Sequence, residues 1–86
     1  MNDPMAIMIG EVLERRRRMI QVSQAKLAEI CSVEEKYISM LERGKRKPGL
    51  KTLFKLAAAF DMKAWELTKE IEEKLEKNGY SPILKE

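Results

Sequence analysis

Basic side chains form the densest chemical feature of this sequence. Four arginines follow one another at positions 15–18, and Lys45, Arg46 and Lys47 form a second run. Residues 1–55 carry 12 basic and 7 acidic side chains, a net charge of +5, whereas residues 56–86 carry 5 basic and 7 acidic ones, a net charge of −2. Ammonium and guanidinium groups attract anions. We therefore expect an anionic partner to bind the first part of the chain.

The sequence lacks the residues that hydrolytic and metal chemistry need most often. It contains no histidine and a single cysteine, Cys31. Histidine is the commonest general base, and zinc sites use histidine and cysteine ligands. A lone cysteine cannot form an internal disulfide, and Cys31 occupies an inward position, so we interpret it as a small core residue. We expect a protein without enzymatic activity and without a metal or cofactor.

The pattern of apolar residues predicts an all-α fold of five helices. Glycine and proline are sparse, and no run of alternating β-branched residues is long enough for a strand. The predicted helices cover residues 4–20, 24–31, 35–43, 50–60 and 64–77. We expect the fourth helix to be central, because it is too apolar for a surface helix. Its apolar residues are Leu50, Leu53, Phe54, Leu56, Ala57 and Phe60.

The chain of 86 residues is short, so we expect one domain over residues 1–79 and a flexible tail at residues 80–86. A chain of this length buries only about 60% of the surface that its unfolded form exposes, which favours a partner chain. No stretch of about 20 apolar residues is present, and the N-terminus lacks the order of a secretory signal. We therefore expect a cytoplasmic protein with no membrane contact.

Residues 24–43 have the spacing of two short helices joined by a tight turn. Ala28 is small enough for a close helix crossing, and Val33 fills the turn. Ile38 and Leu41 follow ten and thirteen residues after Ala28, so we expect them to pack back onto the first helix. This spacing predicts a helix-turn-helix.

The same region resembles a known family along several linked segments. Residues 22–28 (VSQAKLA), 37–48 (YISMLERGKRKP) and 50–57 (LKTLFKLA) are similar to the Cro/phage-repressor family of helix-turn-helix regulators, also called the xenobiotic-response-element (XRE) family. The resemblance covers about residues 9–67. It implies a lambda-repressor-like DNA-binding domain, here with an extended fifth helix. It also implies a sequence-specific regulator of transcription, such as a repressor, in a bacterium or phage.

The resemblance further implies which side chains contact double-stranded DNA. In the family, the helix after the turn lies in the major groove, and its outward residues contact base edges. Carried over to this sequence, the base-contacting residues are Glu34, Glu35, Lys36, Ser39 and Met40. The residues implied to contact the DNA backbone are Ser23, Gln24, Arg43, Lys45, Arg46 and Lys47. Arg17 matches a family arginine that forms a structural ion pair with a glutamate, here Glu42.

Each of these DNA contacts has a plainer alternative. Glu34 and Glu35 would also favour the helix N-terminus electrostatically. Gln24 would also serve as part of the cap beside Ser23, and the lysines after the recognition helix would also suit a solvated loop. The arginines at 15–18 cannot all face one duplex, because successive helical residues turn by about 100°. Apart from Arg17, we interpret them as surface residues or peripheral phosphate contacts.

Three positions depart from the family pattern. Gln21, Ser32 and Asp61 stand where the family has glycine, and a left-handed backbone at a non-glycine residue costs about 1 kcal/mol. Ser32 and Glu35 have the spacing of a capping box, which would start the recognition helix slightly early. The beginning of that helix, and therefore the acid that points at DNA, stays open.

We expect the chain to bind a second copy of itself, because one DNA-binding domain of this size is small. One recognition helix contacts only a few base pairs, too few for selectivity in a genome. Residues 64–77 carry a narrow apolar seam typical of contact between helices. We expect this helix to form a two-fold dimer interface through Trp65, Leu67, Ile71 and Leu75. Such a homodimer would set two recognition helices about 34 Å apart on a palindromic operator.

Two further kinds of partner stay open. Small members of the family include controller proteins of restriction-modification systems and antitoxins, so the alternative function is a DNA-binding protein that also binds a protein partner. In an antitoxin, the tail at residues 80–86 would dock on a toxin; it would otherwise be an arm that wraps the other subunit. An operator that overlaps a promoter would give repression, whereas an operator upstream of it would allow contact with RNA polymerase.

Overall fold

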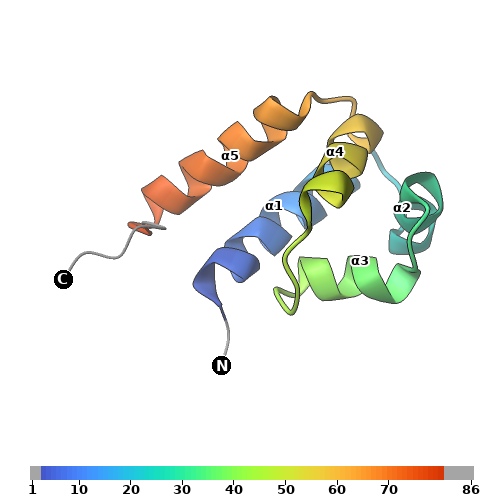
Figure 1. Cartoon of the computed structure of the whole chain (residues 1–86), viewed down its shortest axis with the longest axis horizontal. Coiled ribbons are helices and arrows are strands. Elements are labelled where there is room, and N and C mark those ends of the chain that lie inside the picture. Colours follow the sequence, from blue (N-terminus) through green and yellow to red (C-terminus); the bar gives the residue numbers. More distant parts are fainter. Residues whose placement is uncertain (1–2, 81–86) are drawn as a thin grey trace.

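Five helices make up the part of the chain that the structure describes, residues 3–80 of a computed structural model (Figure 1). Their bounds are α1 Pro4–Met19, α2 Gln24–Cys31, α3 Glu35–Glu42, α4 Leu50–Ala59 and α5 Ala64–Lys77. No strand occurs between residues 3 and 80. The all-α prediction is therefore confirmed, and each helix ends within one residue of its expected bounds. Of the predicted tail, residues 81–86 lie outside the described part.

Side-chain caps explain where the first two helices begin. The Asp3 carboxylate accepts a hydrogen bond from the Met5 amide at 2.9 Å, and Pro4 follows with a φ angle suited to the first helical turn. The Ser23 hydroxyl oxygen accepts a hydrogen bond from the Lys26 amide at 3.0 Å. Both helices therefore start where an oxygen is available to an otherwise unpaired amide.

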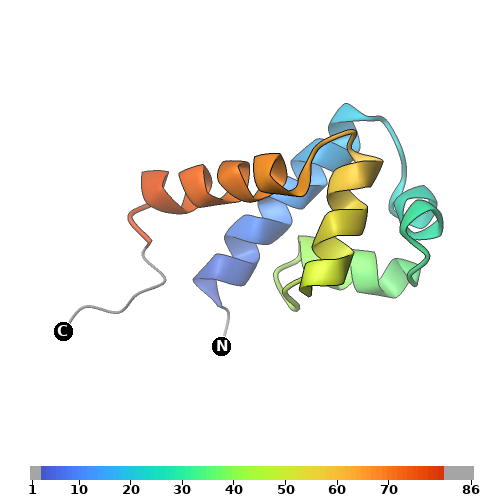
Figure 2. The ribbon, with the colours of Figure 1, turned by 45° about the horizontal axis from the view of Figure 1, so that its top comes forward.

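Among the five helices, α1 contributes the most buried residues. It packs against α3 and against α5, while α2 contacts α3 and α4 (Figures 1 and 2). The buried residues of α1 are Ala6, Ile9, Gly10, Val12 and Leu13. A Cβ atom at Gly10 would lie 2.6 Å from the carbonyl oxygen of Glu42. The backbones of α1 and α3 can therefore approach this closely only because residue 10 has no side chain.

The structure corrects the prediction that the fourth helix is central. Leu56 and Ala57 are buried, but Leu50 and Phe54 expose 72% and 56% of their surface. The apolar residues of α4 form two stripes, and only the stripe that includes Leu56 and Phe60 belongs to the buried core. The prediction was wrong because the apolar residues of α4 lie on two faces of the helix, and only one of these faces is buried.

The apolar seam of α5 lies inside the chain. Leu67, Ile71 and Leu75 are buried in the same core as α1, with exposed fractions of 0%, 7% and 5%. Figure 2 shows α5 crossing α1, which supplies the partner helix that the seam needs. The prediction that Leu67, Ile71 and Leu75 form a dimer interface is therefore wrong, because their own chain covers them. Of the four predicted interface residues, Trp65 is the one that is exposed, at 62%.

Ion pairs reinforce the contact between α1 and α5. Glu70 accepts hydrogen bonds from the guanidinium groups of Arg15 and Arg16, the second at 2.7 Å. Lys74 Nζ lies 3.0 Å from a carboxylate oxygen of Glu11. Two of the consecutive arginines therefore hold α5 onto α1 at the protein surface.

Among residues 3–80, left-handed backbone occurs at three residues other than glycine. The φ angles are 61° at Gln21, 56° at Ser32 and 59° at Asp61, the positions at which the sequence departs from the family pattern. Ser32 ends α2, and its amide bonds to carbonyl oxygens of that helix. The predicted capping box is absent, since Glu34 precedes α3 without a side-chain cap, and α3 begins at Glu35.

A largely buried ion pair joins α1 to α3. Arg17 Nε donates to Glu42 Oε2 at 2.7 Å, and Arg17 Nη2 donates to Glu42 Oε1 at 3.1 Å. Arg17 Nη1 also donates to the Val22 carbonyl oxygen at 2.9 Å, and Gln24 Nε2 donates to Glu42 Oε1 at 2.8 Å. The expected pair of Arg17 and Glu42 is present, and Gln24 extends it to α2. These bonds fix the relative positions of the first three helices.

Loss of the Glu42 carboxylate should destabilise the fold strongly. Glu42→Ala should cost about 3 kcal/mol or more, because it leaves the largely buried Arg17 and the half-buried Gln24 without their acceptor. Thermal unfolding followed by circular dichroism measures the change. Glu14→Ala is the matched control, since the pair of Glu14 and Arg18 is exposed, and it should change stability by less than about 0.5 kcal/mol. Equal losses in both variants would contradict the role of Glu42.

Glycine at a left-handed position should stabilise the fold. Ser32→Gly should gain up to about 1 kcal/mol, because glycine adopts a positive φ without the Cβ penalty. For a domain of this size, such a gain raises the Tm by about 4–8 °C. Ala25→Gly is the control, since Ala25 lies exposed within α2, and it should lower stability by about 1 kcal/mol. A lower Tm for Ser32→Gly would contradict the strain at this turn.

Candidate nucleic-acid interface

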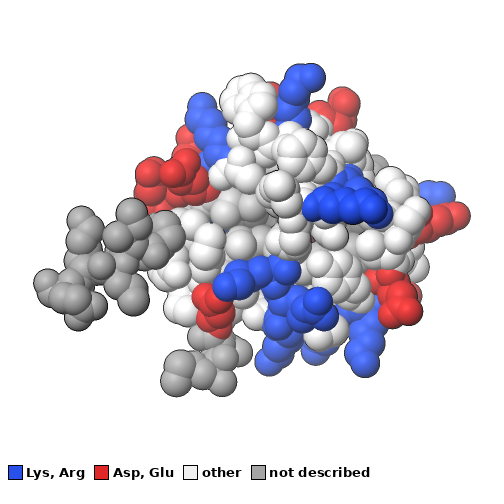
Figure 3. Space-filling view, viewed as in Figure 1, with Lys and Arg blue, Asp and Glu red and all other residues white. Residues whose placement is uncertain are grey.

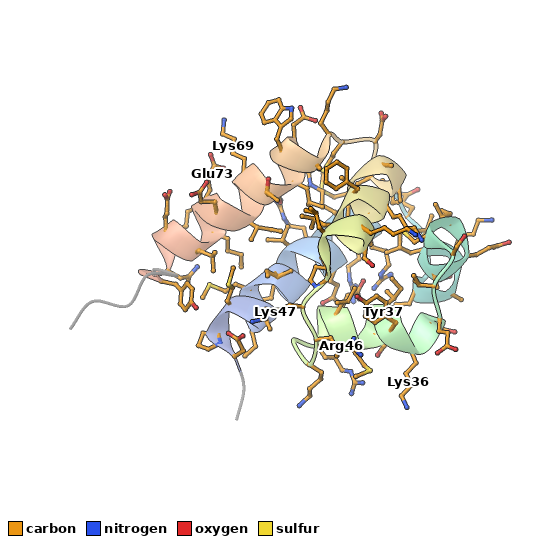
Figure 4. All side chains as sticks on the ribbon, viewed as in Figure 1. Lys36, Tyr37, Arg46, Lys47, Lys69 and Glu73 are labelled. Atoms are coloured by element: carbon orange, nitrogen blue, oxygen red, sulfur yellow. The ribbon has the colours of Figure 1, made fainter. Side chains whose placement is uncertain are left out.

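The residues predicted to contact bases lie on the side of α3 that faces away from the core, or just before that helix. Of these residues, Glu34, Glu35 and Lys36 are exposed, and Ser39 and Met40 are half-buried. On the opposite side, Ile38 and Leu41 are each 1% exposed and anchor the helix in the core. Figure 4 shows Lys36 extending from α3 away from the other helices. The helix therefore presents a polar, accessible surface from a rigid position.

A basic loop follows α3 on the same side of the molecule. The predicted backbone-contacting residues of this loop are all exposed: Arg43, Lys45, Arg46 and Lys47. Figure 3 shows lysine and arginine side chains gathered along the lower edge of the molecule, where Figure 1 places α3 and the loop. The structure thus brings the loop cations and the outward side of α3 onto one surface.

Gly44 sets the path of this loop. Its φ angle is 76°, and its amide donates to the Leu41 carbonyl oxygen at 3.1 Å. The next amide, that of Lys45, donates to the Met40 carbonyl oxygen at 2.9 Å. A Cβ atom at Gly44 would lie 2.8 Å from the Cα atom of Ile7. Glycine is therefore required both for the turn and for the close approach of the loop to α1.

Two loop cations contact side chains of other elements. Lys47 Nζ donates to Asp3 Oδ2 at 2.9 Å, and Arg46 Cζ lies 5.3 Å from the centre of the Tyr37 ring. The hydrogen bond from Lys47 lowers the pKa of the Asp3 carboxyl, and the same bond raises the pKa of Lys47. Both groups therefore carry their charges at neutral pH. The Asp3 carboxylate thus offsets part of the positive charge that Lys47 presents.

The N-terminus of α2 carries the other two predicted backbone contacts. Ser23 Oγ accepts the capping bond from the Lys26 amide, and Gln24 Nε2 donates to Glu42. Both side chains therefore take part in internal hydrogen bonds. The backbone amides at the start of α2 and the positive end of its helix dipole still suit an anion.

A shallow hollow of about 320 Å³ lies between α3 and the basic loop. Its lining residues are Val33, Glu34, Lys36, Tyr37, Met40 and Arg46. They include hydrogen-bond donors, a carboxylate acceptor and apolar surface. These are the three kinds of contact by which the major groove distinguishes base pairs.

The structure places the one cysteine of the sequence, and it shows whether side chains suited to a metal ion gather among residues 3–80. Cys31 is a core residue, as predicted, and is 2% exposed. Burial raises the pKa of its thiol and keeps it protonated. Among residues 3–80, no group of three or more histidine, cysteine or acidic side chains could hold a metal ion. None of the described helices combines the length and apolar character needed to cross a membrane.

The sequence did not predict two residues of this surface, Tyr37 and Asp3. Arg46 follows Tyr37 by nine positions, and Lys47 follows Asp3 by 44. No local pattern marks residues so far apart as partners. The return of the loop toward α3 and α1 brings them together.

Comparisons with known proteins agree with this architecture. A family model described as helix-turn-helix matches residues 13–64. The restriction-modification controller protein C.AhdI from Aeromonas hydrophila is 32% identical, with a TM-score of 0.69 over 72% of this chain and 94% of that chain. The clp gene regulator ClgR from Corynebacterium glutamicum is 22% identical, with a TM-score of 0.80 over 92% of this chain and 84% of that chain.

A third similar structure is the wild-type restriction-modification controller protein C.Esp1396I. It is 18% identical, with a TM-score of 0.78 over 88% of this chain and 99% of that chain. At this identity, as for ClgR, the likeness shows the fold alone. None of the curated proteins matched the chain. The family match spans more than half of the sequence and includes α2, α3 and α4. The chain therefore belongs to the helix-turn-helix family of the xenobiotic-response-element type.

Proposed function

We propose that this chain is a sequence-specific regulator of transcription that places α3 in the major groove of double-stranded DNA. The observation that carries the proposal is the single surface formed by α3 and the basic loop on a helix-turn-helix frame. The major groove is about 12 Å wide and admits one α-helix. Side chains of α3 would then contact base edges while the loop cations bind phosphates.

The side chains of α3 suit different base edges. Lys36 can donate to guanine O6 or N7, and Glu35 can accept from cytosine N4. Met40 offers apolar contact to a thymine methyl group, and Ser39 can bond a base or a phosphate. The two acids, Glu34 and Glu35, also repel phosphate, which penalises binding to duplexes that offer them no partner. Selectivity is the expected consequence.

We also propose that two copies associate through an exposed apolar surface on α4 and the start of α5. This α4–Trp65 surface consists of Leu50, Phe54, Ala58 and Trp65. The three α4 residues lie four positions apart on one helix face, and α4 packs against α5. Figure 3 shows uncharged atoms over α4, with a basic side chain lying across part of it. Exposed apolar groups gathered in this way favour burial against a partner.

A second copy is the occupant that we propose for this surface. One module contacts too few base pairs for selective binding, so two recognition helices are needed. A two-fold arrangement would set the two α3 helices about 34 Å apart and would imply a palindromic operator. Trp65 thus stays in the proposed dimer interface. The outer face of α4 takes the place that the prediction gave to the seam of α5, which is buried.

Control of a restriction-modification system is the second candidate function. The 32% identity to C.AhdI over 72% of the chain favours it. A gene for a restriction endonuclease or methyltransferase beside the gene of this protein would support it, whereas a toxin gene would favour an antitoxin. The predicted toxin contact falls largely on residues 81–86, outside the described part, and a contact with RNA polymerase depends on the position of the operator. In each case we propose a cytoplasmic protein without catalytic activity.

Side chains on α3 and in the loop should affect DNA binding differently. Lys36→Ala and Met40→Ala should change which duplex is preferred, because each removes a base contact. Lys45→Ala should weaken binding to all duplexes alike and reduce the slope of log affinity against log salt by about 1, because one phosphate contact is lost. Selection from a random duplex pool, followed by fluorescence anisotropy over a range of salt concentrations, measures both effects. Identical behaviour of the two kinds of variant would refute the division of roles.

The same selection tests the function itself. We expect the wild-type protein to enrich a palindromic sequence. Binding that shows no preference for any duplex over heparin at physiological ionic strength would refute a DNA-binding regulator.

Acidic substitutions in the α4–Trp65 surface should separate the two copies. Phe54→Glu and Trp65→Glu should give monomers with weak operator binding, because a carboxylate cannot be buried in an apolar contact without cost. Sedimentation velocity measures the oligomeric state. Ile30→Glu is the matched control, since Ile30 is 48% exposed on α2, and it should leave the dimer intact. A dimer unchanged by Phe54→Glu would place the interface elsewhere.

A further inference from the structure

The guanidinium group of Arg46 lies over an aromatic ring of the recognition helix. The distance of 5.3 Å between its Cζ atom and the centre of the Tyr37 ring lies within the range of a cation–π contact. Tyr37 is half-buried and packs against the core, whereas Arg46 is exposed. The ring is therefore the fixed partner in this contact, and the guanidinium group is the movable one.

The backbone brings Arg46 to the ring but leaves its long side chain several rotatable bonds. Gly44 turns the chain, and the bond between Lys45 and Met40 holds the loop against the end of α3. Among residues 3–80, no carboxylate forms an ion pair with Arg46. The Tyr37 ring therefore supplies the contact that restricts this side chain. A side chain that is restricted before binding loses less conformational entropy when it binds.

The guanidinium group of Arg46 keeps hydrogen-bonding capacity beside the ring. It carries five N–H donors, and a cation–π contact with one ring does not occupy all of them. Lys47, in contrast, donates to the Asp3 carboxylate, whose negative charge offsets the attraction of Lys47 for another anion. Arg46 therefore combines a restricted side chain with available donors, which favours binding to a phosphate.

We infer that Tyr37 is a positioning residue for DNA binding, whose ring holds the Arg46 guanidinium group in place to donate to a phosphate of the duplex beside α3. This inference rests on the proposed function. Tyr37 and Arg46 line the same hollow as Lys36 and Met40, so the phosphate contact adjoins the base contacts (Figure 4). Through Arg46, Tyr37 thereby couples the contact with the DNA phosphate to the position of α3 in the major groove.

A double-mutant cycle tests whether Tyr37 acts through Arg46. Dissociation constants are measured by fluorescence anisotropy for the duplex selected by the wild-type protein and for a random-sequence duplex of the same length. Tyr37→Leu should weaken binding to both by about 3- to 10-fold, because it removes the cation–π contact. Tyr37→Phe keeps the ring and should stay within about twofold of the wild type. In an Arg46→Ala background, Tyr37→Leu should have no further effect.

Arg43→Ala supplies the matched background, because Arg43 is an exposed cation of the same loop. There, Tyr37→Leu should keep its full effect. Equal losses from Tyr37→Leu in the wild-type and Arg46→Ala backgrounds would overturn the inference, since the tyrosine would then act directly or through the fold. A loss from Tyr37→Phe as large as that from Tyr37→Leu would also overturn it, because the hydroxyl group would be the contact.

Two measurements distinguish a failure of this inference from a loss of the fold and from a failure of the proposed function. Thermal unfolding should show the Tyr37→Leu variant folded at the temperature of the binding assay. A wild-type protein that selects no duplex would remove the proposed function and the inference with it. A wild-type protein that selects a duplex but tolerates Tyr37→Leu without loss would remove the inference alone.

Discussion

The ion pair of Arg17 and Glu42 is the constraint on which the interface depends. Arg17 lies in the last turn of α1, Glu42 is the last residue of α3, and Gln24 is the first residue of α2. One carboxylate therefore joins the three helices that surround the recognition surface. A largely buried carboxylate tolerates few geometries, because a displaced partner leaves its charge uncompensated. Gly10 acts at the same crossing by letting the backbone of α1 approach the carbonyl oxygen of Glu42. The position of α3 thus rests on a charged contact as well as on apolar packing.

The packing of α1 against α5 also decides which apolar surface is left over. Because α1 covers the seam of α5, Leu67 and its neighbours contribute to the core of one chain. The outer stripe of α4 has no such cover within the described residues, and Phe54 and Trp65 stay exposed. An apolar surface of this kind is a natural place for a second copy, whose presence would double the number of base pairs contacted. The packing of α1 against α5 therefore determines both the core of the monomer and the surface that we propose for the dimer interface.

The local features of this protein were predictable from the sequence. Apolar periodicity and capping residues gave the five helices to within one residue at each end, because both depend on neighbours along the chain. The family pattern marked the left-handed positions, including Ser32, and the pair of Arg17 and Glu42. The capping box predicted at Ser32 does not form, because a residue that ends one helix in left-handed backbone cannot also cap the next. For the candidate site, the sequence predicted the cations of the loop. It did not predict that Asp3 contacts Lys47 or that Tyr37 contacts Arg46.

By itself, the sequence thus determined the helices, the turn between α2 and α3, and the types of side chain available to a nucleic acid. The tertiary structure alone decided that Leu67 faces α1 while Phe54 faces solvent, and that Tyr37 supports Arg46. Periodicity shows that a helix has an apolar face, but not which helix covers it. That choice depends on the path of the chain through space, which brings together residues that no short-range pattern connects.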